Sequence, residues 1–250
     1  MEPRLPLVGM ARERQRLNQA FRESKPLLIL GPPGSGKTRL IREALSSNEK
    51  ILYVTWERSL HALLVKMART LMASRHQEFL RLARLPGRRR ADREAWLLAQ
   101  TSVHLKGLLW SAFESSPVPI VLDGIAGAGF PTYRFLHRIY HARGMALFAS
   151  SRDAFCLGAL ARLFWDPTKV LNIAPLHDSE AEQLFDRAAD CFKLRDLDLE
   201  EFREKVLESA KGNPGQILEM CRLATQPQYI SGRYVKFSPL RIDTIIKFAG

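Results

Sequence analysis

Cysteine is scarce in this sequence and follows no pattern typical of a disulfide or metal site. The three cysteines, Cys156, Cys191 and Cys221, lie far apart, with no CxxC pair and no histidine at metal-ligand spacing. Disulfide frameworks and zinc sites depend on such spacings. The sequence therefore favours neither, and we expect free thiols in a reducing cytosol.

Long apolar runs are absent as well. No segment reaches the roughly 18 uncharged apolar residues that a membrane-spanning helix needs. The opening sequence MEPRLPLVGMARERQ lacks the apolar core of a signal peptide, and we find neither an internal repeat nor a low-complexity tail. These absences predict a soluble, cytoplasmic protein without a membrane partner.

Acidic residues are outnumbered by basic ones. The sequence has 26 Asp and Glu and 38 Lys and Arg, which gives a net charge of +12. Such an excess favours a polyanionic partner through counterion release, although charge alone identifies none. A length of 250 residues, of which 46% are hydrophobic, is enough for one large α/β domain and a small satellite.

The stretch LLILGPPGSGKTRLI, residues 27–41, combines a strand, a glycine loop and the start of a helix. Residues 27–30 form a short apolar run of the kind found in buried parallel strands. Residues 31–38, GPPGSGKT, match the P-loop pattern GxxxxGKS/T in full, so backbone N–H groups are expected to point at phosphate oxygens. Lys37 would reach the β- and γ-phosphates, and Thr38 would ligate Mg²⁺. The predicted nucleotide-binding residues of this loop are Pro33, Gly34, Ser35, Gly36, Lys37 and Thr38.

A P-loop also needs a carboxylate at the end of a neighbouring strand to hold the metal through its water shell. Asp123 follows the apolar run PIVL and ends a predicted strand over residues 118–124. We therefore predict that Asp123 and Thr38 form the Mg²⁺ site.

Alternating strands and helices favour an α/β fold with a parallel sheet and helices on both faces. Further strands are predicted over residues 51–56, from Met145 and from Lys169, and helices over residues 60–72 and 132–140. We expect this nucleotide-binding core to cover residues 1–175.

The composition changes from Leu176 onward to one helical pattern after another. Ser179 and Glu182 fit a capping box at the start of the first helix. Gly212 fits the end of the second helix and Pro214 the first turn of the third. We expect a small helical lid over residues 176–226, and a hairpin around Gly232 with a terminal helix over residues 227–250.

The order of these motifs resembles the AAA+ superfamily, and more narrowly its STAND and origin-recognition-like branch. LVGMARERQRL, GPPGSGKT, IVLDG, FASSR and GNPGQI follow one another between Leu7 and about Ala224. The resemblance implies a P-loop ATPase core with a helical lid, and ATP and Mg²⁺ as cofactors. It implies that Val8 and Gly9 line the adenine pocket and that Pro214 packs on the base, although a proline there also simply starts a helix. GTP stays open, because the base-contacting residues come from the resemblance alone.

The resemblance also implies that Arg152, which follows Ser151 at the end of a core strand, reaches the γ-phosphate. A planar guanidinium suits that task because it offers a fork of donors to phosphate oxygens. The alternative is a surface arginine at the end of a strand.

One position departs from the family pattern. Hydrolysing relatives usually follow the metal-binding Asp with a second acid that orients the attacking water, and that position is Gly124 here. Glu57, at the end of the second strand, is the candidate substitute, because RecA-like relatives place their catalytic Glu there. The alternative is a solvated Glu beside Arg58. Without a water-positioning group, turnover is expected to be slow.

A strongly basic segment, residues 75–100, lies between the second and third predicted strands. Its arginines suit phosphate backbones, and its interleaved aromatic residues are candidates to stack on unpaired bases. The alternatives are a protein or subunit interface and a solvated face whose apolar residues pack beneath a helix. Arginines of this segment, or Arg162, are also candidates to complete a neighbour's ATP site. The predicted nucleic-acid-binding residues are Arg84, Arg88, Arg89, Arg90 and Arg93.

The leading hypothesis is an ATP-binding AAA+/STAND-type switch, in which Mg-ATP closes the lid on the core and controls self-assembly or partner binding. Its partners would then be ATP or ADP, copies of itself or a larger assembly, and in one alternative DNA. The alternatives are an ATP-dependent DNA-binding factor of a replication, transposition or defence system, and a catalytically weak regulatory subunit of a larger complex. Whether the chain is a working ATPase stays open at this stage.

Overall fold

The computed structural model describes the chain except residues 1–4, 6, 46–50, 86–88, 143–144 and 250. The chain divides into two compact units, each built from separate stretches of sequence. The sheet unit comprises residues 15–30 and 41–172, and the helical unit comprises residues 1–14, 31–40 and 173–250. The predicted domain boundaries after residues 175 and 226 stay a prediction.

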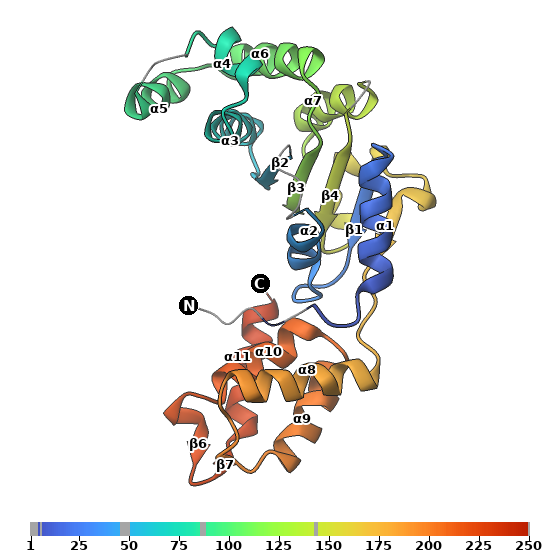
Figure 1. Cartoon of the computed structure of the whole chain (residues 1–250), viewed down its shortest axis with the longest axis vertical. Helices are drawn as coiled ribbons and strands as arrows, with labels where there is room; N and C mark the ends of the chain where they lie inside the picture. Colours follow the sequence, from blue (N-terminus) through green and yellow to red (C-terminus); the bar gives the residue numbers. More distant parts are fainter. Residues whose placement is uncertain (1–4, 6, 46–50, 86–88, 143–144, 250) are drawn as a thin grey trace. The chain divides into compact units, whose positions relative to one another are not determined.

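The sheet unit is built around a five-stranded parallel sheet in the order β2-β3-β4-β1-β5. β2, β3 and β4 are neighbours in the order of the chain, whereas β1 lies between β4 and β5. Because all the pairs are parallel, each connection has to return to the other end of the sheet, and the connections carry helices (Figure 1). The predicted parallel α/β fold is confirmed. The strands are β1 (Leu27–Leu30), β2 (Leu52–Thr55), β3 (Ile120–Ile125), β4 (Leu147–Ser151) and β5 (Val170–Asn172).

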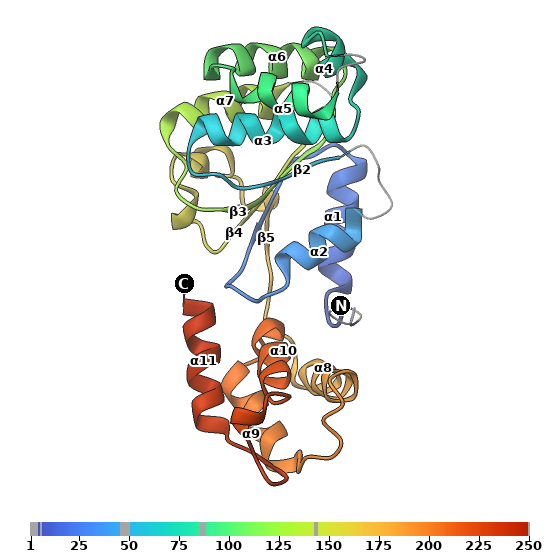
Figure 2. The same ribbon diagram turned by 90° about the vertical axis from the view of Figure 1, so that its left-hand side faces the viewer.

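Helices lie around this sheet, as the view in Figure 2 also shows. The connection from β2 to β3 is the longest and holds a helical group in which α3 packs against both β2 and α6. The sequence patterns predicted α3 and α7 but not α6. The helices are α1 (Ala11–Arg22), α2 (Lys37–Leu45), α3 (Leu60–Ala73), α4 (Gln77–Leu82), α5 (Arg90–Leu98), α6 (Ser102–Ser115) and α7 (Phe130–His141).

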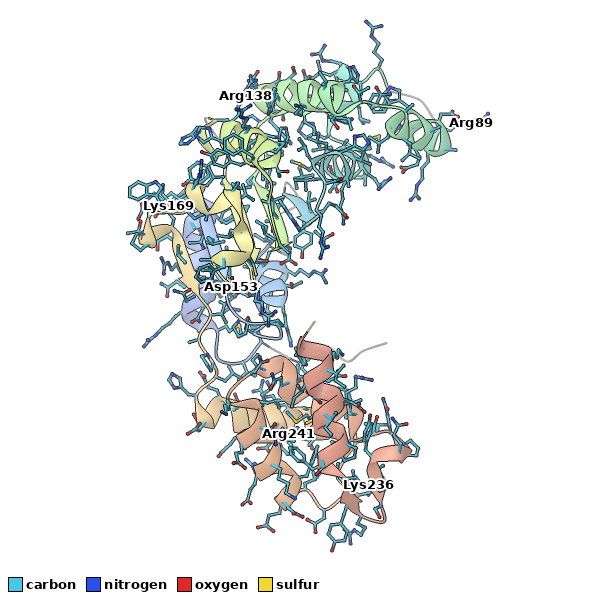
Figure 3. The ribbon with its side chains drawn as sticks, turned by 180° about the vertical axis from the view of Figure 1, so that it is seen from behind. Arg89, Arg138, Asp153, Lys169, Lys236 and Arg241 are labelled. Atoms are coloured by element: carbon cyan, nitrogen blue, oxygen red, sulfur yellow. The ribbon has the colours of Figure 1, made fainter. Side chains whose placement is uncertain are left out.

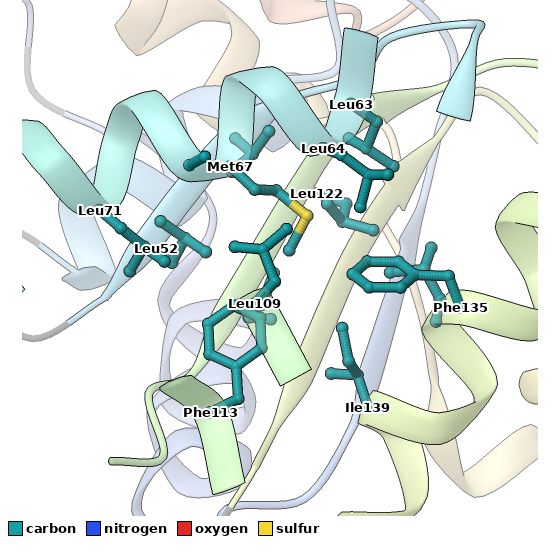
Figure 4. Close-up of a cluster of buried hydrophobic side chains, with 14 of the residues drawn as sticks. Leu52, Leu63, Leu64, Met67, Leu71, Leu109, Phe113, Leu122, Phe135 and Ile139 are labelled. Atoms are coloured by element: carbon teal, nitrogen blue, oxygen red, sulfur yellow. The ribbon is translucent and has the colours of Figure 1, made fainter. Parts of the chain in front are cut away.

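The core of the sheet unit forms where α3, α6 and α7 meet the sheet (Figure 4). Leu109 and Phe113 of α6 are spaced four apart, so they share one face of the helix and are both buried. Phe135 and Ile139 of α7 repeat this spacing. Burying a side chain of this size contributes about 1.5–3 kcal/mol, so these faces fix α6 and α7 on the sheet.

The helical unit has its own hydrophobic core, which includes Phe185, Val206 and Ile217. The short strands β6 and β7 pair antiparallel around Gly232, and a terminal helix follows, so the hairpin and this helix are confirmed. The described elements are α8 (Asp178–Cys191), α9 (Glu200–Ala210), α10 (Pro214–Leu223), β6 (Ile230–Ser231), β7 (Tyr234–Val235) and α11 (Phe237–Ala249).

The predicted capping box of α8 was wrong. The N-cap residue is His177 rather than Ser179, and the carboxylate of Glu180 accepts a hydrogen bond from the His177 backbone N–H at 3.1 Å. Ser179 therefore lies inside the first helical turn. The shift arises because an acid three residues after His177 satisfies a backbone donor that would otherwise be unpaired at the helix start.

No helix among the described residues combines the length and the apolar character that crossing a membrane requires.

Candidate functional site

The glycine loop that follows β1 encloses the side chain of Lys37. Gly34 and Gly36 adopt left-handed backbone, with φ of +82° and +91°, which lets the loop turn back on itself. The ammonium of Lys37 donates to the carbonyl oxygens of Gly31 at 2.6 Å and Pro32 at 2.9 Å. Helix α2 begins at Lys37, so its first N–H groups and the ammonium belong to the same short segment. This is an arrangement of donors that suits an anion.

The N-terminus of α10 is bonded to this loop within the helical unit. The side-chain amide of Asn213 donates to the Pro33 carbonyl, and the Gly215 backbone N–H donates to the Gly34 carbonyl, each at 2.9 Å. The approach is close, because a Cβ built at Gly215 would lie 2.6 Å from the Gly34 Cα. Pro214 is the first residue of α10, as its pattern predicted. Its contact with a base stays a prediction.

Val8 and Gly9 also lie in the helical unit. Val8 is buried in the core of that unit together with Leu176. Gly9 has a φ of +72°, and a Cβ built on it would lie 2.6 Å from Oε2 of Glu180. The residues for which the resemblance implies base contacts, Val8, Gly9 and Pro214, thus belong to the same compact unit as the P-loop.

Asp123 is buried in the sheet unit, and both of its carboxylate oxygens accept hydrogen bonds from hydroxyl groups. The hydroxyl of Ser150 on β4 donates to Oδ1 at 2.5 Å, and the hydroxyl of Tyr53 on β2 donates to Oδ2. Burial, reinforced by the bond to this carboxylate, raises the pKa of Tyr53 to about 12. The phenol therefore stays protonated near neutral pH and remains a donor to Asp123.

Sequence reasoning missed Tyr53 and Ser150. Each residue is on a strand that flanks β3, so the order of the strands in the sheet brings both to Asp123. Tyr53 pairs with Val121, two residues before Asp123, and Ser150 lies near the carboxyl end of β4. Both hydroxyls position the carboxylate that we predict to hold the metal.

Gly124 lies in an irregular part of β3, where the pairing with β4 shifts between Leu122 and Ile125. Its φ is +79°, and its backbone N–H donates to the Ser150 hydroxyl at 2.8 Å. The same hydroxyl donates to Asp123. The glycine that replaces the usual acid is therefore part of the backbone geometry that fixes Asp123.

Gly124→Ala is expected to lower the free energy of unfolding by about 1–2 kcal/mol, because left-handed backbone is unfavourable for a residue with a Cβ. Crowding does not contribute, since no atom of the described residues lies within 4 Å of a Cβ built at this position. Gly124→Asn is the matched variant and should lose less, because Asn tolerates this conformation better. Urea denaturation measures both, and a Gly124→Ala protein as stable as wild type would contradict the argument from φ. Gly124→Glu, which restores the missing acid, carries the same strain.

Glu57 and Arg152 follow β2 and β4, so they lie at the same carboxyl edge of the sheet as Asp123. Glu57 forms an ion pair with Lys66 of α3 at 2.5 Å, and about a third of each side chain is exposed. Arg152 is exposed, whereas the preceding Ser151 is buried and donates to the Ile125 carbonyl. The structure brings these residues to one edge, and their catalytic roles stay predictions.

The basic segment carries exposed arginines over a buried apolar layer. Arg84 follows α4, Arg89 is the N-cap of α5 and Arg90 is its first residue, and all are exposed. Arg93 is partly buried, and its Nε lacks a hydrogen-bond partner among the described residues. Arg88 lies outside the described residues. Phe79 is fully buried, as the alternative of apolar packing beneath a helix predicted, so it is not available to stack on a base. Nucleic-acid binding by the arginines stays a prediction.

The residues present fit Mg-ATP. Glycines with left-handed backbone build the loop, and a Cβ at Gly34 would lie 2.6 Å from the side chains of Asn213 and Phe248. The donor set is a lysine ammonium with the N–H groups of a helix start, which suits phosphate. The hydroxyl of Thr38 and the carboxylate of Asp123 are each oxygen donors of the type that Mg²⁺ prefers, and their role as metal ligands stays a prediction.

A family model for an AAA ATPase domain matches residues 6–198. A search of curated protein sequences found no match. Solved structures with the same fold include Cdc6p from Pyrobaculum aerophilum, with a TM-score of 0.61 and 16% identity over 90% of this chain and 63% of that one. They also include a Walker-type ATPase from Pyrococcus abyssi, with a TM-score of 0.59 and 14% identity over 96% of this chain and 72% of that one.

A further match is a STAND protein with a tetratricopeptide repeat sensor from Pyrococcus horikoshii. Its TM-score is 0.51 and its identity 20%, over 98% of this chain but only 33% of the STAND protein. This chain thus spans about a third of the STAND protein and less than two thirds of the Cdc6p chain.

Proposed function

This chain belongs to the AAA ATPase domain family, and from that membership and the geometry of its P-loop we propose that it is an ATP-binding molecular switch. In this proposal, Mg-ATP binds at the P-loop and alters the helical region, which controls self-assembly or the binding of a partner. The predicted resemblance to the AAA+ superfamily is confirmed. The narrower STAND or origin-recognition-like character belongs to the proposal.

The observation that carries the proposal is the pair of hydrogen bonds from Asn213 and Gly215 to the P-loop carbonyls of Pro33 and Gly34. The loop predicted to hold phosphate and the first turn of α10 are joined through backbone atoms. A loop that adjusts around phosphate therefore acts directly on α10. A ligand shifts a conformational equilibrium when it binds one arrangement better than the other, and these bonds supply a structural route for such a difference.

Each site residue has a role in the proposal. Lys37 and the N–H groups of the loop bind the β- and γ-phosphates. Thr38 and Asp123 hold Mg²⁺, which when bound neutralises charge on the phosphate oxygens. Tyr53 and Ser150 orient Asp123. Val8, Gly9 and Pro214 contact the base, and Arg152 binds the γ-phosphate.

Hydrolysis is slow in this proposal. Gly124 has no side chain to orient water, and the carboxylate of Glu57 is engaged by Lys66. Phosphoryl transfer depends on positioning and electrostatics, so a site without a water-orienting carboxylate loses much of its rate. The chain would then stay in its ATP-bound form long enough for assembly to respond.

Steady-state ATP hydrolysis, measured together with sedimentation in Mg-ATP and Mg-ADP, tests the function. We expect slow turnover, and a change in sedimentation with ATP but not with ADP. If Glu57→Gln abolishes what turnover there is, Glu57 is the water-orienting base, and Lys66→Met should then raise the rate by freeing it. Sedimentation that is identical with either nucleotide and with none would contradict control of self-assembly. If binding of a partner is likewise unaffected by nucleotide, the switch fails.

The second candidate function is an ATP-dependent DNA-binding factor. The exposed positions of Arg84, Arg89 and Arg90 favour it, because guanidinium groups bind phosphate backbones well. Nucleic-acid binding by an Arg89→Gln/Arg90→Gln protein tests whether these arginines contact nucleic acid.

A further inference from the structure

Helix α7 carries a row of aromatic and basic side chains along its more exposed side, and one of them, Tyr133, also packs against the edge of the core. The spacing follows helical periodicity, and the opposite side of the helix, which includes Phe135 and Ile139, is buried. Five of the six residues are exposed, and Tyr133 is half-buried. We call this row the α7 stripe, and it consists of Phe130, Tyr133, Arg134, His137, Arg138 and His141.

The rings of the α7 stripe lie close to one another along the helix. The ring centroids of Phe130 and Tyr133 lie 5.5 Å apart, those of Tyr133 and His137 also 5.5 Å, and those of His137 and His141 4.5 Å. From the first to the last residue of the row the helix advances by eleven residues, which is roughly 16 Å along its axis. Because neighbours already restrict these rings, a ligand that lies along them loses little side-chain entropy on binding.

Guanidinium groups surround the first ring of the stripe. The guanidinium of Arg134 lies 4.9 Å from the ring centroid of Phe130, and that of Arg162 lies 5.8 Å from it. The segment that contains Arg162 is held there by backbone hydrogen bonds to the residues before α7. One of these bonds runs from the Ala159 N–H to the Ala128 carbonyl at 2.9 Å. Among the described residues, no carboxylate forms an ion pair with Arg134 or Arg162, whereas Arg138 pairs with Glu114.

Phe155 is an exposed aromatic residue in a segment that is bonded to the residues before α7. Its side chain is 97% exposed, and the next residue, Cys156, accepts a hydrogen bond from the Gly127 N–H at 2.7 Å through its carbonyl. The segment of Phe155 is therefore held next to the start of α7. An exposed phenyl ring in this segment is available to stack on an unpaired base.

We propose that the α7 stripe, together with Arg162 and Phe155, binds single-stranded nucleic acid. Guanidinium groups supply contacts to the phosphates, and exposed rings stack on unpaired bases, which a duplex keeps inside its own stack. An acidic protein would use the charges but would not need exposed flat rings. The proposal goes beyond the ATP switch, because none of these residues belongs to the P-loop or to the predicted base contacts.

The stripe is separate from the basic segment predicted from the sequence. Both belong to the sheet unit, and Figure 3 shows Arg138 on the stripe well apart from Arg89 at the start of α5. The two arginine surfaces can therefore be tested independently with variants that remove the same charge.

Fluorescence anisotropy with an oligothymidine of about 20 nucleotides tests the proposal, since one single-strand site covers ~4–16 nucleotides. Phe155→Ala should weaken binding roughly 5- to 100-fold with an unchanged salt dependence, because it removes stacking and no charge. Arg134→Gln/Arg162→Gln should weaken binding and lower the log-log salt slope by about 0.7 for each phosphate that is no longer neutralised. Phe155→Tyr should keep the affinity, because it keeps the ring.

The controls are Arg233→Gln/Arg241→Gln, which removes the same charge from exposed positions of the helical unit, and Tyr234→Ala, which removes another exposed ring. Both should leave binding unchanged, whereas the Arg89→Gln/Arg90→Gln protein tests the second candidate function. The proposal is overturned if Phe155→Ala binds like wild type, if only the Arg89→Gln/Arg90→Gln protein loses affinity, or if a duplex of equal length binds as tightly. Equally tight binding of polyglutamate would also overturn it and would indicate an acidic protein partner. Circular dichroism confirms folding, which the exposed position of Phe155 should leave intact.

Discussion

Lys37→Ala is expected to weaken ATP binding by roughly 100-fold or more. A hydrogen bond to a charged group contributes about 1.5–3 kcal/mol, and the ammonium of Lys37 is predicted to contact both the β- and the γ-phosphate. Isothermal titration with Mg-ATP measures the loss. Lys25→Ala is the matched control, because it removes the same charge from a side chain that is 70% exposed. Micromolar affinity retained by the Lys37→Ala protein would contradict the assignment of the P-loop as the ATP site.

A second variant separates phosphate contact from loop structure. Lys37 also donates to the carbonyls of Gly31 and Pro32, so its removal changes the loop as well as the charge. Thr38→Ala leaves those bonds in place and removes the predicted metal ligand. We expect this protein to bind ATP without metal as wild type does, while losing the gain in affinity that Mg²⁺ confers. An undiminished effect of Mg²⁺ would mean that Thr38 does not hold the metal.

The P-loop and the strand before it were predictable because their signals are local. The apolar run of β1, the glycine pattern and the start of α2 are adjacent in the sequence, and each favours the same strand-loop-helix arrangement. Asp123 was predictable for the same reason, because it directly follows an apolar run, although β3 continues past it to Ile125.

The hydroxyl groups around Asp123 depend instead on the order of strands in the sheet. Tyr53 and Ser150 are separated from Asp123 by 70 and 27 residues in the sequence. Nothing near either residue indicates a buried carboxylate partner. Only the pairing of β2, β3 and β4 brings the three side chains together. A pass along the chain that assigns elements one by one does not determine that order.

Exposure was the other property that composition did not reveal. Phe79 and Phe155 both lie close to arginines in the sequence, yet Phe79 is fully buried and Phe155 is 97% exposed. Phe79 lies on a helix that packs against α6, whereas Phe155 lies in a short connection after β4. The sequence likewise predicted a helix over residues 132–140, but it did not indicate which side chains of α7 lie exposed.

Gly215→Ala is expected to separate α10 from the P-loop and to weaken ATP binding at least tenfold. The added Cβ would lie 2.6 Å from the Gly34 Cα and 2.7 Å from the Gly34 carbonyl oxygen. Both are backbone atoms, which cannot rotate away as the end of a flexible side chain can. The hydrogen bond from the Gly215 N–H to Gly34 would be lost with the displacement. Overpacking of this kind costs about 1–3 kcal/mol of stability.

Gly107→Ala is the matched control, because it makes the same chemical change at a position where the described part of the chain has no atom within 4 Å of the added Cβ. Gly107 is inside α6, so alanine should stabilise the protein by about 0.5–1 kcal/mol and leave ATP affinity unchanged. A lower thermal unfolding temperature for Gly215→Ala and a higher one for Gly107→Ala would show that the contact with Gly34, rather than the methyl group itself, determines the result. Asn213→Ala should also weaken ATP binding and lower stability, since it removes the hydrogen bond to the Pro33 carbonyl and the cap of α10. If Gly215→Ala binds ATP as wild type does, the bond between α10 and the loop does not transmit the bound state, and the switch must act through another contact.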